Sequence, residues 1–282
     1  RQRQMCIRDR IIRALASRLP TTHTLTPVIQ DEIHRTEAGL YGERYVANLL
    51  KEQGIFILQD CTIEHHQMDV LVISENGCTV LEVKNIKGKV RLTEAPRQLL
   101  RTNEDGTVNI FTSPVVQLEN SIRALQHIFL KHKIDLPIYG AISFPFHSAE
   151  ISASNCPYPI VVGKDLLNFL NSQPIIPKKF TSRQLQNVAK QIKQASRPFN
   201  RYPLCARFKI QSDEIISGCR CDNCGTYGLE RCLRSWRCSV CHHSNSDAHK
   251  QALHEYACLI NDQISIQEAM TVSYTHLRAH ET

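Results

Sequence analysis

The sequence predicts a mixed α/β fold, with a central sheet flanked by helices, followed by a small cysteine-rich module. Short runs rich in Val, Ile and Leu alternate with segments whose apolar residues recur at helical spacing, which is typical of this class. Seven of the twelve cysteines fall between Cys205 and Cys241, which indicates the separate module. A chain of 282 residues with 42% hydrophobic content is long enough to bury a sizeable core.

The two ends of the chain are set aside from the fold prediction. Residues 1–10, RQRQMCIRDR, and residues 272–282, VSYTHLRAHET, resemble translated sequencing-adapter read-through, and we expect the natural protein to be longer. The formal net charge of +7 loses three charges without residues 1–10, so about 7 − 3 = +4 remains. This mild basic bias favours polyanionic partners.

The first elements are an arm and a helix. Residues 11–36 contain prolines and threonines with little periodicity, so they predict a short N-terminal arm. A helix is predicted over 37–53, where Val46 and Leu50 belong to an apolar stripe. Glu43 stands three and seven residues before these two, which places its carboxylate on the core-facing side.

Strands and further helices follow. Strands are predicted over 55–59, 68–74, 79–84 and 138–144, and Pro114 is expected to open an amphipathic helix. Residues 70–73 are all apolar, as expected of a central strand covered on both faces. Residues 160–194 predict a strand and two helices. The predicted organisation is an arm at 11–36, an α/β domain at 37–200 and a cysteine module at 201–260.

Charged residues in the predicted sheet indicate a functional site. Glu82 and Lys84 leave the same face of one strand, roughly 7 Å apart at about 3.3 Å per residue. Asp69 lies on the preceding strand, and a hairpin that pairs the two strands brings it beside Glu82. An ordinary exposed ion pair, contributing ~0–1 kcal/mol, is the alternative that the spacing leaves open.

Converging carboxylates suit a hard divalent cation such as Mg²⁺ or Mn²⁺, which prefers oxygen ligands. Such an ion polarises a phosphoryl oxygen and activates a water for phosphodiester hydrolysis. We expect Asp69 and Glu82 to hold the ion, with Glu43 adding a ligand or a supporting contact. Lys84 is expected to orient or activate the water and to offset developing charge.

Four short motifs carry a family resemblance. They are Gly42-Glu43, Gln67-Met68-Asp69, Glu82-Val83-Lys84-Asn85 and Pro114-Val115-Val116-Gln117, within residues 35–145. In this order they resemble the nuclease-related domain, NERD, of the PD-(D/E)XK nuclease superfamily. The resemblance implies a restriction-endonuclease-like αβββαβ core. It also implies that Glu43, Asp69 and Glu82 are acidic site residues, Lys84 the catalytic lysine and Gln117 a site glutamine at a helix start.

The cysteine module contains two CxxC pairs separated by thirteen residues, a spacing typical of four-thiolate zinc ribbons. The expected ligands of a structural Zn²⁺ are Cys221, Cys224, Cys238 and Cys241. Cys219 is an alternative to Cys221, and a redox or disulfide role of the pairs is the other interpretation. Four protein ligands close the coordination, so catalysis is expected elsewhere.

Basic and aromatic residues beside these cysteines point to nucleic-acid contact. Arg231, Arg234 and Arg237 could contact phosphates, and Trp236 could stack on a base. A solvated ribbon face with a packed tryptophan is the alternative interpretation.

The function predicted from these features is a metal-dependent nuclease, a hydrolase with DNA as the expected partner and RNA as the less favoured one. Two alternatives are a non-catalytic nucleic-acid-binding module of the same fold and a scaffold that docks a protein through the zinc ribbon. No run approaches the roughly 18 apolar residues of a membrane span, and no signal peptide stands near the start. Together with the metal-type cysteine spacing, this predicts a cytoplasmic protein without a membrane partner.

Overall fold

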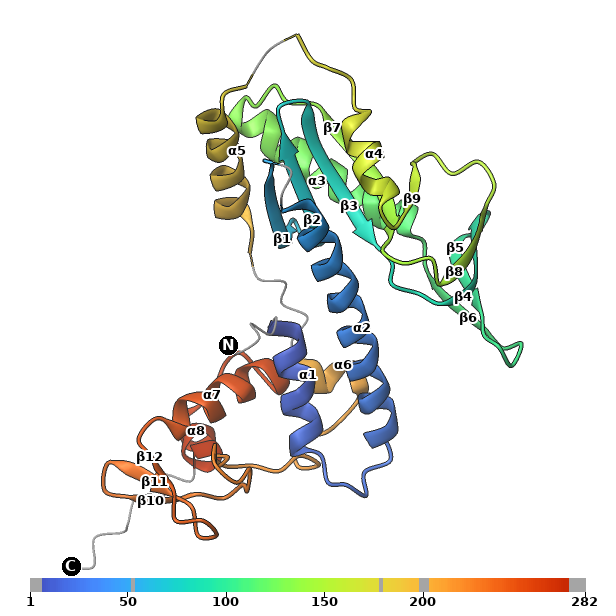
Figure 1. Ribbon diagram of the computed structural model, residues 1–282. Helices are drawn as coiled ribbons and strands as arrows, with labels where there is room; N and C mark the ends of the chain where they lie inside the picture. Colours follow the sequence, from blue (N-terminus) through green and yellow to red (C-terminus); the bar gives the residue numbers. More distant parts are fainter. Residues whose placement is uncertain (1–6, 52–53, 178–179, 198–202, 274–282) are drawn as a thin grey trace, which may run out of the picture. The chain divides into compact units, whose positions relative to one another are not determined.

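The computed structural model describes residues 7–51, 54–177, 180–197 and 203–273, and Figure 1 labels their helices and strands. The chain divides into two compact units. One is Ala38–Phe199, and the other combines Arg1–Glu37 with Asn200–Thr282. Helix α2 (Thr26–Leu50) has residues in both units.

The unit Ala38–Phe199 is built on a five-stranded sheet with the strand order β1-β2-β3-β7-β9. β1 (Phe56–Ile63), β2 (His66–Ser74) and β3 (Gly77–Val83) pair as antiparallel hairpins. β7 (Ile138–Phe144) and β9 (Ile160–Val162) extend the sheet in parallel. With α2 before β1 and α3 (Pro114–His132) before β7, the elements follow in the order αβββαβ. The α/β class predicted from the sequence is confirmed.

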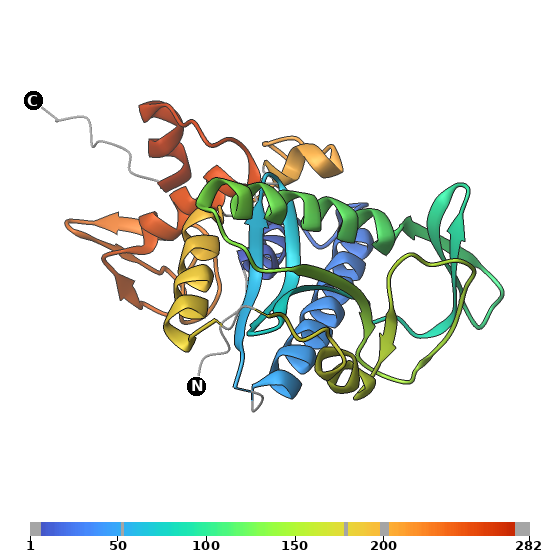
Figure 2. The same cartoon turned by 90° about the horizontal axis from the view of Figure 1, so that it is seen from above.

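Helices cover both faces of this sheet. α3 and α5 (Ser182–Ala195) pack on one face, where Leu71 shares a core with Leu118 and Ile192. The C-terminal part of α2 and α4 (Asp165–Asn171) pack on the other, where Val70 shares a core with Val46. In Figure 2 the green α3 lies on one side of the strands, and the blue α2 and olive α4 lie on the other. The apolar run 70–73 is therefore buried on both faces, as predicted.

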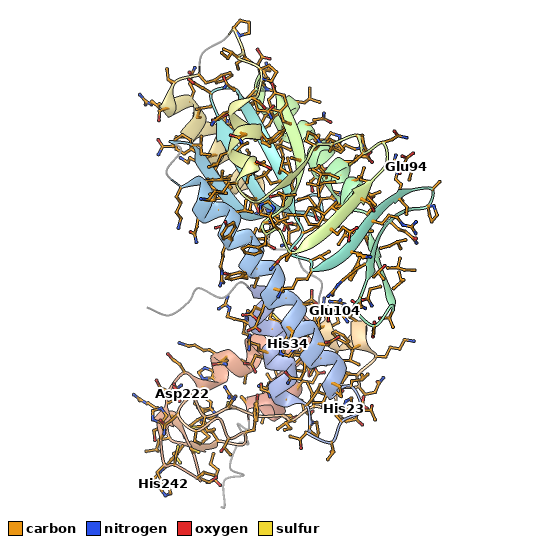
Figure 3. The ribbon with its side chains drawn as sticks, turned by 45° about the vertical axis from the view of Figure 1, so that its right-hand side comes forward. His23, His34, Glu94, Glu104, Asp222 and His242 are labelled. Carbon is orange, nitrogen blue, oxygen red and sulfur yellow. The ribbon has the colours of Figure 1, made fainter. Side chains whose placement is uncertain are left out.

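Three of the four strands of a second sheet stand between β3 and α3 in the sequence, and the fourth follows β7. The strand order of this sheet is β6-β5-β4-β8, formed by β4 (Gly88–Glu94), β5 (Arg97–Thr102), β6 (Val108–Thr112) and β8 (Ala149–Ala153). Glu94 and Glu104, labelled in Figure 3, stand at its first and second hairpin turns.

This second sheet was not predicted from the sequence, although its residues carry a strand signal. Val90 and Leu92 are buried, whereas Lys89 and Arg91, which precede them, are exposed. This two-residue alternation is the ordinary signal of a strand with one covered face. Strands β4, β5 and β6 stand between two site motifs in the sequence. β4 follows the motif that contains Lys84, and β6 precedes α3, which carries Gln117.

The second unit contains helices from both ends of the chain. They are α1 (Ile7–Arg18), the first part of α2, α6 (Leu204–Phe208), α7 (Ala248–Leu259) and α8 (Ile266–Ser273). A small sheet joins β10 (Glu230–Cys232), β11 (Ser235–Arg237) and β12 (Ser244–Asn245). One apolar core includes Leu15, Ile33, Leu204 and Leu259. Segments before and after the α/β unit therefore fold together.

The arm predicted over 11–36 is wrong, because this segment is helical. Ile11, Leu15 and Leu19 are all buried and stand four residues apart. α2 starts at Thr26 rather than near residue 37. Pro27 occupies its second position, where a missing N–H costs nothing, so this proline starts the helix instead of excluding it.

The terminal segments that were set aside are described only in part. Residues 1–6 and 274–282 lie outside the described residues, whereas residues 7–10 belong to α1 and residues 272–273 end α8. Within the described ranges, no helix is both long and apolar enough to cross a membrane.

Candidate functional site

The candidate site lies where the ladder between β2 and β3 ends. Val70 and Leu81 are the last paired residues, so continuation of this register places Asp69 opposite Glu82. The Asp69 Oδ2 accepts a hydrogen bond of 2.9 Å from the backbone N–H of Val83. This contact fixes the Asp69 carboxylate against the end of β3.

Lys84 links the end of β3 to helix α3. Its backbone N–H donates to the Ser143 carbonyl of β7 at 2.8 Å, which holds it beside the sheet. Its Nζ donates to Glu82 Oε1 at 2.7 Å and to Gln117 Oε1 at 2.9 Å. The side chains of Glu82 and Lys84 are only 4% and 19% exposed. The pair is therefore not the solvent-exposed ion pair that the strand spacing left open.

Burial and like charges raise the pKa of Asp69 well above its ordinary value. Burial is the largest cause, and the charges of Glu82 and Glu43 add to it, while Lys84 acts in the opposite direction. Burial lowers the pKa of Lys84, but Glu82 and Asp69 outweigh it, so the net shift is upward. Asp69 and Glu82 therefore repel one another beside a protonated Lys84, and a bound cation would relieve this repulsion.

Helix α2 approaches the site closely at Gly42. A Cβ at this position would lie 2.8 Å from the Cβ of Asn85 and 3.2 Å from the Cγ of Pro145. The Asn85 Nδ2 donates to the Ala38 carbonyl of α2 at 2.8 Å. Gly42 and Asn85 therefore dock α2 against the end of β3, close enough for the charge of Glu43 to act on Asp69. Asn85 belongs to one of the four motifs, but its role in positioning α2 was not predicted from the sequence.

We expect Gly42→Ala to destabilise the α/β unit. The added methyl group must push aside Asn85, which is held by its hydrogen bond, and such overpacking costs about 1–3 kcal/mol. Gly39→Ala in the same helix is the matched control, because nothing lies within 4 Å of its added Cβ. That variant should gain about 0.5–1 kcal/mol from the lower entropy of the unfolded chain. Urea unfolding measures both, and equal stabilisation by both would refute close docking at Gly42.

The carboxylates do not form a closed metal cage. Among the described residues, the converging group of three or more possible ligands is made of cysteines alone. Glu43, Asp69 and Glu82 are not found as such a group. Mg²⁺ is commonly held by one or two carboxylates and several waters, so Asp69 and Glu82 would suffice as direct ligands.

Four cysteines of the second unit do converge. The Sγ atoms of Cys221, Cys224, Cys238 and Cys241 all lie within 4.8 Å of one another. Two of the separations, Cys221 to Cys241 and Cys224 to Cys238, are 3.5 Å. Zinc–sulfur bonds of about 2.3 Å in a tetrahedron separate the thiolates by about 3.8 Å, so this cluster could hold a metal such as zinc. Cys219, the alternative to Cys221, is buried outside the cluster.

Local hydrogen bonds favour the thiolate form at two of the four cysteines. At Cys221 the backbone hydrogen bond from Cys224 lowers the pKa, but burial and hydrogen bonds to neighbouring thiols outweigh it and raise the pKa to about 11. Hydrogen bonding to the side chain and then the backbone of Thr226 lowers the pKa of Cys224 to about 6. Hydrogen bonding to Asn223 lowers the pKa of Cys241. Thiolates are the metal-binding form of cysteine. Figure 3 labels Asp222 within the first CxxC pair and His242 directly after the second.

Trp236 cannot stack on a base as the sequence analysis expected. It is only 4% exposed, and its ring stacks on His249 with the centroids 4.4 Å apart. The Arg231 guanidinium lies 5.2 Å from the ring centroid. The packed tryptophan, left open as the alternative, is the observed arrangement, because a small sheet needs a large apolar residue in its core. Arg231, Arg234 and Arg237 are exposed.

Comparison with known proteins identifies the α/β unit. Residues 38–145 match the family model of the nuclease-related domain. This part of the chain is a NERD domain. The match includes all four motifs from Gly42 to Gln117, and it confirms the family resemblance of the sequence. No curated protein and no solved structure matches the chain. The NERD assignment links the chain to nuclease-like chemistry.

Proposed function

We propose that this protein is a metal-dependent nuclease that hydrolyses phosphodiester bonds of DNA. One observation carries the proposal: the shielded Lys84 Nζ is shared between Glu82 and Gln117, beside Asp69, within a NERD domain. A purely structural ion pair needs neither the glutamine nor a second carboxylate with a raised pKa. Perturbed groups gathered in this way are typical of catalytic sites.

Asp69 and Glu82 would hold Mg²⁺ or Mn²⁺ in this proposal. A bound divalent cation supplies positive charge that polarises a phosphoryl oxygen and acidifies a water. The fit rests on the donor chemistry, because these carboxylates offer hard oxygen atoms and repel one another. Glu43 would support the site from α2.

Lys84 would stabilise negative charge on the phosphate rather than remove a proton. The carboxylates raise its pKa, so it stays protonated at neutral pH. A protonated amine donates hydrogen bonds to phosphate oxygens and to the attacking water. Gln117 accepts one of the Lys84 hydrogen bonds and thereby holds Nζ in place, which is a positioning role.

The cysteine cluster would hold a structural Zn²⁺, in this proposal, and would present basic residues to the nucleic acid. All four thiolates serve as ligands, so no position is left for a substrate. The exposed Arg231, Arg234 and Arg237 stand on or beside the hairpin of β10 and β11. Arginines on an exposed hairpin favour contact with phosphates.

Cleavage of labelled single-stranded and duplex DNA by the full chain tests the nuclease proposal. We expect products that require added Mg²⁺ or Mn²⁺ and that are lost in Asp69→Asn. No cleavage above this variant with either metal would reject the nuclease and favour the non-catalytic binding module.

Asp69→Asn should also stabilise the protein at neutral pH when no Mg²⁺ or Mn²⁺ is added, by about 1 kcal/mol. The amide keeps the acceptor for the Val83 N–H but removes a charge that Glu82 and Glu43 repel. Because folding raises the pKa of Asp69, wild-type stability falls as the pH rises from the ordinary value of about 3.9 through the raised one. The advantage of the variant should therefore be near zero in acid and largest at neutral pH.

Urea unfolding between pH 4 and pH 8 measures this difference. Added Mn²⁺ should stabilise the wild type and leave Asp69→Asn unchanged. A variant that is less stable than the wild type at pH 7 without metal would show that Asp69 is a structural residue.

A further inference from the structure

Three aromatic side chains form a cluster on the surface of the NERD domain. The ring of Tyr41 stacks on that of Phe146, with the centroids 5.6 Å apart and the planes at 20°. Tyr45, one helical turn after Tyr41, lies 4.6 Å from the same ring at 52°. Tyr41 is 61% exposed, so one aromatic ring is held by its neighbours and still reaches the solvent.

Two rings of this aromatic cluster are chain neighbours of the contact that docks α2 beside the candidate active site. Tyr41 precedes Gly42 in α2, and Phe146 follows Pro145 after β7. A Cβ at Gly42 would meet Pro145 and Asn85, the residue that follows Lys84. Tyr41 and Phe146 are therefore each one residue away from the close contact that joins α2 to the end of β3.

The segment that continues from Asn85 carries positive charge. Lys87 and Lys89 follow Asn85 and are both exposed. The Arg101 Nε donates to the Lys87 carbonyl at 2.9 Å, which brings a guanidinium to the same segment. An exposed aromatic ring near basic side chains fits a nucleic-acid strand better than it fits an apolar protein partner.

We propose that Tyr41, supported by Phe146 and Tyr45, stacks on an unpaired base of a single DNA strand whose phosphate lies at Asp69, Glu82 and Lys84. This inference rests on the proposed function and specifies its substrate as single-stranded DNA. The face of a base is free for stacking in a single strand, whereas neighbouring pairs cover it within a duplex. Tyr41 is pre-organised by its contacts, so little side-chain entropy is lost on binding.

An abasic scan tests the stacking. A set of fluorescently labelled dT12 oligonucleotides carries one abasic position each, and anisotropy measures their binding to the full chain with Ca²⁺ in place of Mg²⁺. For the wild type, the abasic change at one particular position should weaken binding about tenfold. Tyr41→Ala should bind intact dT12 about tenfold more weakly and lose this position dependence, whereas Tyr41→Phe should keep it.

Leu130→Ala is the matched control, since Leu130 is another exposed apolar residue of the same unit, 77% exposed on α3, and should bind like the wild type. A flat scan in the wild type, an unchanged scan in Tyr41→Ala, or no binding of dT12 would overturn the stacking proposal. Cleavage is measured separately. A protein that cleaves DNA but gives a flat scan would refute stacking alone, and one that stacks a base without cleaving would refute the nuclease alone.

Discussion

Replacing Glu82 by glutamine is expected to lower the rate of DNA cleavage about a hundredfold to a thousandfold. The reason is that the metal site, which stabilises the charge of the transition state, loses a negatively charged ligand. The amide has nearly the same volume, and its oxygen can still accept the hydrogen bond from Lys84. The fold should therefore survive while the metal site loses a negative charge. The loss should appear in kcat more than in KM, since Glu82 would hold the metal ion that acts on the reacting phosphate.

Single-turnover cleavage with Mg²⁺ measures this effect. Glu75→Gln is the matched control, because Glu75 lies in the exposed turn at the opposite end of the same β2–β3 hairpin. It should cleave like the wild type. Equal rates for Glu82→Gln and the wild type would show that the Glu82 carboxylate is not a ligand of the metal ion.

A test of Lys84 needs a second substitution at its ion-pair partner Glu82. Lys84→Met leaves the buried Glu82 charge without its ion-pair partner, which costs about 3–5 kcal/mol. Its inactivity alone would not distinguish lost chemistry from lost folding. The double variant Glu82→Gln/Lys84→Met should recover most of this stability and cleave more slowly than Glu82→Gln alone. Equal cleavage rates for the double variant and Glu82→Gln would show that Lys84 is structural.

Removal of zinc is expected to unfold the cysteine module, because structural zinc sites contribute about 10 kcal/mol or more of apparent binding free energy. Cys238→Ser should have the same consequence, since Cys238 is buried beside Trp236 and Leu229 in one small core. Trp236 is the single tryptophan of the chain, so its fluorescence reports on this module alone. Loss of the metal should shift its emission to longer wavelength as the ring becomes exposed.

Metal analysis and the emission maximum test this prediction together. Cys232→Ser is the control, because Cys232 is exposed on the β10–β11 hairpin and lies outside the cluster. It should keep one zinc ion per chain and the wild-type spectrum. A Cys238→Ser protein that did the same would contradict the four-thiolate assignment.

Local patterns were sufficient to predict much of this protein. The all-apolar run 70–73 predicted a central strand, and Pro114 with its apolar stripe predicted α3 at its observed start. The alternation of Glu82 and Lys84 predicted two charges on one face of β3. These features succeed because residue spacing alone determines which side chains share a face.

The helices of residues 11–36 and the burial of Trp236 depend on contacts that no local pattern shows. Prolines and threonines in 11–36 obscured the helical spacing of Ile11, Leu15 and Leu19. The helices of that segment pack against residues that follow position 200, and this long-range partnership has no local signal. Tryptophan is a residue type that often stacks on bases, but the Trp236 ring packs against His249 and is buried.

The sequence by itself determined the α/β class, the main strands of the central sheet, the NERD motifs and the two CxxC pairs, because each depends on spacing within a short segment. The tertiary structure decided which groups share one environment. It buried the pair of Glu82 and Lys84, brought Gln117 to the lysine, docked α2 through Gly42 and placed Tyr41 on Phe146. Apart from the pair of Glu82 and Lys84, these contacts join residues far apart in the chain, and the strength of all of them depends on distance and burial, which no spacing rule contains.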